Sequence, residues 1–326
     1  MATGVTVTDI VSEYGSYYIN EGQNKSRVLR KLMQDLVTPQ FMTQIKTDDT
    51  LYRLANGVIN NLTQAFQKTF TAKGGTTFTA KPIEMFHIKV DDSVYPDDIV
   101  GTWLGFLEGM EENERKNWPL VRYLVEEYYM PQISSDIELK EIFAGNRVAP
   151  TNAVAGITGE SMDGLRKLII AGLNDGTMNH VLQATPTTSN IFDHVEAFVD
   201  SIGDVYKNVP MNIFMSPTWK RAYLRDKRAQ GFYTIPGESG VNDGVDFTPQ
   251  KVVGLPSMEG SNIFFATPKS NLIYITKRQS GFNNFKIEEY RREVSFMLDF
   301  WIGVGFGINE IVWVANANGS GSGSGA

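Results

Sequence analysis

The stretch that decides the fold is Asn283-Asn284-Phe285-Lys286-Ile287-Glu288-Glu289-Tyr290-Arg291-Arg292-Glu293, which leads into Trp301-Ile302-Gly303-Val304-Gly305-Phe306-Gly307-Ile308-Asn309-Glu310-Ile311-Val312-Trp313. Three glycines alternate with apolar residues, which predicts a strand with one apolar face and one face almost without side chains. Glycine inside a strand marks a bend or the close approach of another backbone. No catalytic set of residues accompanies the stretch, which favours a chain that packs against copies of itself.

The chain has 326 residues, which is enough for one large domain or two ordinary ones. Hydrophobic residues make up 42% and charged residues 21%, so the chain has the means to build a substantial core. Cysteine is absent, which excludes disulfides and thiolate metal sites and predicts a reducing, intracellular setting.

The charge balance argues against a dedicated nucleic-acid binder, because the net charge is −7 and no long basic stripe is present. The start of the chain lacks the charged and apolar regions of a signal peptide. No window approaches eighteen consecutive apolar residues, so the sequence predicts no membrane span.

A search for reactive constellations predicts a protein that is not an enzyme and that needs no cofactor or metal. The three histidines, His87, His180 and His194, lack ligand spacing. The glycines at 303–307 are flanked by strand pattern on both sides, so they do not form a dinucleotide-binding loop. The acidic pairs at 91–92 and 97–98 are interpreted as a solvated turn rather than a calcium loop.

Helical periodicity predicts helices over residues 25–37, 119–143, 162–173, 191–206 and 218–229. Pro131 should bend the second helix, and Ser216 followed by Pro217 should start the last. Short strands are expected over residues 211–215, 251–256, 263–266 and 272–275. Residues 15–22 are interpreted as an extended arm that either frays or docks on a neighbour.

A polar hairpin is expected around Gly74-Gly75, with residues 67–73 and 76–81 as its two arms. Threonine and phenylalanine alternate through both arms, and a Gly-Gly pair suits a two-residue turn. Arms with so few large aliphatic side chains cannot form their own core. The hairpin must therefore lie on a surface or reach another subunit.

The order of these parts, with three local strings, resembles the Hong Kong 97 (HK97-like) fold of major capsid proteins of tailed double-stranded DNA phages. The strings are YYMPQISSDIE at 128–138, NIFMSPTWKRAY at 212–223 and KVVGLP at 251–256. They look like the end of a spine helix, the strand and helix of an axial domain, and the strand that follows the axial loop. The resemblance covers about residues 10–315 and rests on the order of elements.

The resemblance implies an α+β fold with an N-terminal arm, an extended β-hairpin loop, a long spine helix, a peripheral domain and an α/β axial domain. The implied division is 1–62 for the arm and its helix, 63–98 for the extended loop, 99–150 for the peripheral domain with the spine helix, 151–256 for the axial domain, 257–315 for strands returning to both domains, and 316–326 for a flexible Gly/Ser tail.

The implied function is that of a structural subunit that self-assembles as hexamers and pentamers into an icosahedral phage head around double-stranded DNA. The expected partners are further copies of the chain, a separate scaffolding protein, a portal, a decoration protein and packaged DNA read without sequence specificity, with no membrane. The expected place is the virion capsid, assembled in the host cytoplasm.

The candidate inter-subunit contacts are Lys68, Phe70, Lys73, Phe78 and Lys81 in the hairpin, and Tyr17 and Tyr18 in the arm. Three alternatives stay open at this point: an encapsulin-like compartment shell, a tail structural protein, and an α/β enzyme whose site escapes the sequence. The long threonine-rich hairpin favours the phage shell over the compartment.

Overall fold

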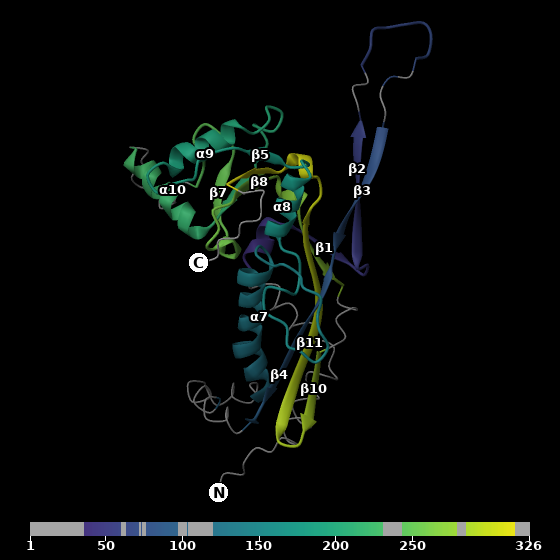
Figure 1. Cartoon of the computed structure of the whole chain (residues 1–326), viewed down its shortest axis with the longest axis vertical. Helices are drawn as coiled ribbons and strands as arrows, with labels where there is room; N and C mark the ends of the chain where they lie inside the picture. Colours follow the sequence, from purple (N-terminus) through teal and green to yellow (C-terminus); the bar gives the residue numbers. More distant parts are fainter. Residues whose placement is uncertain are drawn as a thin grey trace, which may run out of the picture.

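The computed structural model describes residues 36–59, 63–71, 73, 76–96, 103, 120–230, 243–278 and 285–316. The molecule is elongated (Figure 1). A long sheet with a helix beside it forms the lower part, a second sheet with three helices forms the upper part, and a two-stranded hairpin projects from the upper end. This mixture of helices and sheets confirms the predicted α+β class.

The long sheet is built on one strand, β11 (Glu293–Phe306). The first half of β11 pairs with two antiparallel neighbours, and its last five residues pair with a third. The tight turn before it uses Arg291 at a φ of 61°. The strand predicted from the alternating glycines is therefore confirmed. The other strands are β1 (Thr43–Thr47), β4 (Phe86–Val94), β9 (Leu272–Lys277) and β10 (Phe285–Tyr290).

The second sheet has five short strands in the order β5-β12-β8-β6-β7. Helices α9 and α10 pack on one face of it, and alternate residues of β6 point to the two faces. Ile213 faces the helices, whereas Phe214 joins the larger core on the other side. The elements are β5 (Asn179–Val181), β6 (Asn212–Met215), β7 (Lys251–Gly254), β8 (Phe264–Thr267), β12 (Trp313–Ala315), α8 (Leu165–Asn174), α9 (Ile191–Asp200) and α10 (Pro217–Ala229).

Local sequence signals explain where several helices begin. Ser216 caps α10 by accepting a hydrogen bond from the backbone N–H of Trp219, as its position before Pro217 predicted. Helix α9 is shorter than predicted: it ends at Asp200, because residues 201–206 form turns instead.

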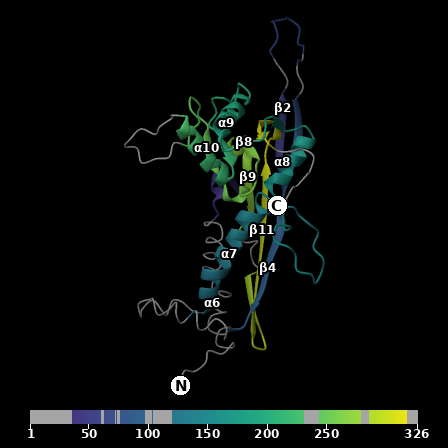
Figure 2. The same cartoon turned by 60° about the vertical axis from the view of Figure 1, so that its left-hand side comes forward.

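The spine helix runs without interruption through α6 (Leu120–Tyr123), the wider turns Leu124–Tyr129, α7 (Met130–Asp136) and the wider turns Ile137–Glu141. It agrees with the helix predicted over 119–143. It lies alongside the long sheet (Figures 1 and 2), and its buried side chains Val125, Met130, Ile133 and Ile137 enter the larger core.

Two buried carboxylates hold loops against this helix. Glu138 accepts hydrogen bonds from the backbone N–H and the hydroxyl of Thr38, which attaches the segment before β1. Glu141 accepts from the backbone N–H groups of Gly159 at 2.8 Å and Met162 at 3.3 Å. Each charge is therefore satisfied where water is excluded.

The hairpin differs from the prediction in its first arm. Strand β3 (Thr76–Glu84) pairs with β2 (Leu51–Ile59) and not with residues 67–73. The prediction of a two-residue turn at Gly74-Gly75 is therefore wrong, and the extended hairpin begins at β2, before residue 63. The physical reason lies at the root of the hairpin. Tyr52 and Leu54 contact a small core formed by Ile83, Met85, Ile273 and Ile275, and residues 67–73 carry no large aliphatic side chain that could take their place.

The glycines of β11 allow the root of the hairpin to approach closely. A Cβ on Gly303 would lie 2.4 Å from the carbonyl oxygen of Glu84, and one on Gly305 would lie 2.9 Å from the side chain of Ile83. Only residues without a side chain fit these two positions, as the alternation predicted.

The two sheets are joined by a short connection after β11. Asn271 donates to the backbone oxygen of Ile308 at 2.8 Å and accepts from its N–H at 2.7 Å. The backbone N–H of Gly307 also donates to the oxygen of Asn271. This junction fixes how β11 leads into β12. Within the described residues, no helix is long and apolar enough to span a bilayer.

We predict that Gly303→Ala lowers the free energy of unfolding by about 1–3 kcal/mol, because the added methyl group collides with backbone that cannot rotate away. Urea denaturation measures the difference. The matched control is Gly156→Ala, where a Cβ meets nothing within 4 Å, and its effect should stay within about 0.5 kcal/mol. Equal effects of the two substitutions would show that the close approach is not a constraint.

Candidate functional site

The three histidines lie on separate elements. His87 stacks on Trp301 at a ring distance of 4.6 Å, and the ammonium group of Lys277 lies 4.0 Å from the centre of the same indole. The Nε2 atom of His194 lies 2.6 Å from the backbone oxygen of Ala184. In the part of the chain that the structure describes, no three His, Asp or Glu side chains come close enough to hold a metal ion.

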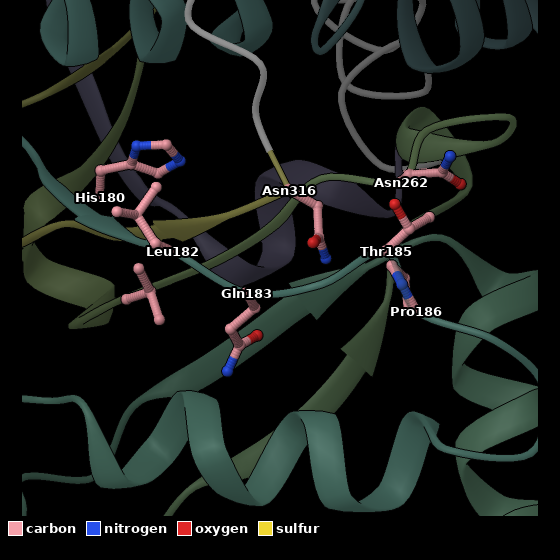
Figure 3. A pocket seen from close by; sticks show the side chains of 8 residues that line it. His180, Leu182, Gln183, Thr185, Pro186, Asn262 and Asn316 are labelled. Atoms are coloured by element: carbon pink, nitrogen blue, oxygen red, sulfur yellow. The ribbon is translucent and has the colours of Figure 1, made fainter.

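A hollow of about 220 Å³ lies at the edge of the second sheet (Figure 3). Its walls are mostly polar, and the carboxamides of Gln183 and Asn316 each keep one buried atom without a partner. His180 is the one titratable group among the residues that line it, so this hollow offers no acid–base pair. The lining residues are His180, Val181, Leu182, Gln183, Thr185, Pro186, Asn262 and Asn316.

The first acidic pair lies in a strand, not in the predicted turn. Asp91 and Asp92 are exposed on β4, and Lys89 binds the carboxylate of Asp91 at 2.6 Å. Burial, together with a hydrogen bond to Asp92, raises the pKa of Tyr129 above its usual value. The pairing of β4 with β11 explains the difference, since it makes this segment a strand in which Asp91 and Asp92 point to opposite faces and both stay exposed. Residues 97–98 lie outside the described part.

The far end of the hairpin is the least supported part of the described structure. We call residues 63–71 and 73 the hairpin tip; all of them are exposed. Phe66 and Phe70 are 93% and 92% exposed. Among the residues that the structure describes, the tip bonds to itself: Gln64 donates to the backbone oxygen of Thr71 at 2.8 Å, and Lys73 donates to that of Thr63. Two exposed aromatic rings on one short segment make the tip a candidate binding surface.

The structure brings three of the sequence-predicted contact residues together in this tip: Lys68, Phe70 and Lys73. Phe78 lies in β3, but the structure does not describe its side chain, and Tyr17 and Tyr18 lie outside the described residues. Phe66 was missed. Phe70 was selected from the alternation of threonine and phenylalanine in the predicted arm 67–73, and Phe66 lies one residue before that arm.

Lys81 lies apart from the tip, near the root of the hairpin. Its ammonium group donates to the side-chain oxygen of Asn309, whose nitrogen donates to the hydroxyl of Thr177 at 2.8 Å. Burial lowers the pKa of Lys81 from 10.5 to about 8, although the negative charge of Glu310 acts in the opposite direction. This chain of bonds attaches the hairpin to the connection between the two sheets.

Comparison with known proteins gives matches in structure alone, because no family model and no curated sequence matches the chain. A chain of the satellite phage P4 procapsid, which includes the size determination (Sid) protein, is 11% identical, with 89% of this chain and 90% of that chain covered and a TM-score of 0.57. A chain of Mycobacterium phage Ogopogo is 11% identical, with 86% and 91% covered and a TM-score of 0.52. A chain from the capsid of an empty GTA particle is 10% identical, with 85% and 87% covered and a TM-score of 0.51.

The chain has the HK97-like capsid fold. The resemblance inferred from the order of elements is thereby confirmed. At identities of 10–11% the comparison supports the fold alone. Candidate contact residues are therefore identified from the exposure and the bonds of this chain's own side chains. In the HK97-like fold of this chain, the hairpin tip is the strongest candidate for a functional surface.

We predict that the stability difference between the wild type and Lys81→Met shifts in favour of the wild type as pH rises from about 8 to 10.5. In that window the unfolded chain binds a proton at Lys81 that the folded chain has already released, so folding becomes more favourable with pH. Urea denaturation of both proteins at several pH values measures the shift. A difference that is flat or falls with pH would contradict the burial of Lys81.

Proposed function

We propose that this chain is the structural subunit of a closed icosahedral shell, a phage head in which hexamers and pentamers of the chain enclose double-stranded DNA. The observation that carries the proposal is a capsid fold whose hairpin ends in two exposed phenylalanines without a core of their own. Such a hairpin is stable as part of a larger assembly and costly as an isolated projection.

The partner surface is another copy of the chain. Two fully exposed phenylalanine side chains offer about 300–500 Å² of apolar area, a useful part of the roughly 1,600 Å² of a standard interface. The hairpin tip and the surface it meets are different patches, so the contact is head-to-tail. Repeated around a rotation axis, head-to-tail contacts close into rings, and many modest contacts then give a stable container.

The proposed contact residues are Phe66 and Phe70, with Lys68 and Lys73 at their flanks and Phe78 on β3. The two lysines supply polar contacts at the edge of an apolar centre, which is the usual composition of an interface. Tyr17 and Tyr18 remain proposed contacts of the arm. We assign Lys81 to the attachment of the hairpin within its own chain, because its ammonium group already binds Asn309.

The proposed role is structural and not catalytic, and the proposed location is the virion, with assembly in the host cytoplasm. A scaffolding protein, a portal and a decoration protein are proposed as partners. Packaged DNA is proposed to be held without base-specific contacts, in keeping with the net charge of −7.

Negative-stain electron microscopy of the chain, expressed alone and with its genomic neighbours, tests the proposal. Uniform angular shells are expected, and nucleic acid inside native particles distinguishes a phage head from a compartment that encloses an enzyme. Rings or tubes under every condition would favour a tail protein. A chain that stays monomeric under all conditions would overturn the proposal.

We predict that the double substitution Phe66→Ser and Phe70→Ser reduces the yield of particles at least tenfold, while the melting temperature of the unassembled chain changes by no more than about 1 °C. Both side chains lack contacts in the monomer, so their loss should affect association alone. Sedimentation and circular dichroism give the two measurements.

The matched control is Thr63→Ala with Gln67→Ala, two exposed positions of the same tip, which should assemble as the wild type does. Deletion of residues 70–79 should act like the double serine variant and leave a folded subunit that assembles poorly. Wild-type particle yields from the serine variant would show that the tip is not a contact.

A further inference from the structure

The hollow at the edge of the second sheet lies where strands β5 and β12 separate. The two strands run parallel, and the chain continues from each of them into a wall of the hollow: Gln183 follows β5, and Asn316 follows β12. In Figure 3 the side chains of Gln183 and Asn316 lie between those of His180 and Thr185. In open α/β sheets, ligands bind beyond the carboxyl ends of the strands, so this position favours a binding site.

Two buried polar atoms at the hollow have no hydrogen-bond partner among the described residues. They are the Oε1 atom of Gln183, which is an acceptor, and the Nδ2 atom of Asn316, which is a donor. The carboxamide of Gln183 is held in place, because its nitrogen donates to the backbone oxygen of His194 at 3.2 Å. A buried polar atom without a partner costs free energy, so both atoms are better satisfied when a ligand is bound. The hollow of about 220 Å³ has room for a group much larger than one water molecule, whose share of the liquid is about 30 Å³.

The walls of the hollow carry no Asp, Glu, Lys or Arg side chain, although these residues make up 21% of the chain. A phosphate, a carboxylate or a metal ion would lose its hydration here without compensation. The ligand that fits is neutral, donates to Gln183 and accepts from Asn316, and a peptide group offers this combination. The hairpin tip of another copy fits poorly, because it brings the charges of Lys68 and Lys73.

Strand β5 offers an extended peptide a place to pair beside the hollow. It is the last strand of the second sheet, and among the described residues it pairs with β12 alone. The backbone N–H of Asn179 points toward β12, since it donates to the oxygen of Val312 at 3.0 Å. The N–H and C=O of the next residue, His180, therefore point away from the sheet. Addition of a strand to such an edge is a common way to bind a peptide.

We propose that β5 and the hollow beyond it bind an extended, uncharged peptide segment of a partner protein. The segment adds a strand at the backbone of His180, and Leu182, which is 84% exposed, supplies an apolar contact. An amide group of the segment enters the hollow, where it donates to Gln183 and accepts from Asn316. This site goes beyond the proposed function, since it depends neither on the hairpin tip nor on the formation of a shell.

The test uses a strand-forming probe, the peptide Thr-Val-Asn-Val-Thr, fused after residue 326 of the full chain. Residues 317–326 are rich in Gly and Ser, and a linker of this length and composition spans about 16–19 Å on average, which gives a millimolar effective concentration. Hydrogen exchange of the unassembled subunit, followed by NMR, should show the backbone N–H of His180 exchanging at least twofold more slowly than in the wild type. A fused run of five prolines is the control and should give no slowing, because proline has no N–H to donate.

The substitutions His180→Pro and His180→Ala separate the backbone of this residue from its side chain. The measurement is the NMR signal of the Asn316 side-chain amide, which should shift when the probe enters the hollow. Alanine keeps the outward N–H and should keep the shift, whereas proline removes the N–H and should abolish it. Gln183→Met is a second variant that leaves the backbone intact. It removes the acceptor in the hollow and should return the exchange of the His180 N–H to the wild-type rate.

A chain that ends at residue 316 tests whether the chain's own end is the occupant. Faster exchange at His180 in this shorter chain than in the full chain would mean that residues 317–326 bind the edge, which would overturn a partner protein as the occupant. No slowing with the strand-forming probe, or equal slowing with the proline probe, would also overturn the inference. All these measurements use the unassembled subunit, so their failure leaves the proposed function standing.

Discussion

The close approach of the hairpin root to β11 is the constraint on which the rest of the structure depends. Two glycines remove the side chains that would keep the backbone of Glu84 and the side chain of Ile83 away. Because β11 is also the central strand of the long sheet, the same residues position the sheet, the spine helix packed beside it and the direction in which the hairpin leaves the molecule. The hairpin is held by a small core at its root, whereas the residues of the hairpin tip are exposed.

The apolar residues are buried in the body of the molecule and exposed at its periphery. Two large clusters fill the space around the second sheet and the spine helix, and a small one fills the root of the hairpin. Beyond the root, Phe66 and Phe70 at the hairpin tip, and Phe247 in the turn before β7, are exposed to water. A single chain cannot bury these rings. The proposed function supplies a reason, because in a shell each subunit would bury part of the surface of its neighbours.

The sequence predicts best where a local signal agrees with the tertiary structure. The alternating glycines, the spine helix and the Ser216 cap are all governed by residues close together in the chain, and all three are confirmed. The first arm of the hairpin was assigned wrongly because long-range contacts decide which segment pairs with β3. Tyr52 and Leu54 pack against a core that includes Ile273 and Ile275, more than 200 residues away in the sequence, and no local pattern reveals this contact. Of the proposed contact residues, Phe70 was selected from the alternation of threonine and phenylalanine in the hairpin, and its contact with another subunit stays a prediction.

The junction at Asn271 has a consequence for how the subunit bears force. One side chain binds both the N–H and the oxygen of Ile308, where the long sheet passes into the second sheet. Load applied to the hairpin travels along β11 and reaches the α/β domain through these bonds and the continuous backbone, with no flexible linker between. We therefore expect the hairpin root and the second sheet to move as one body.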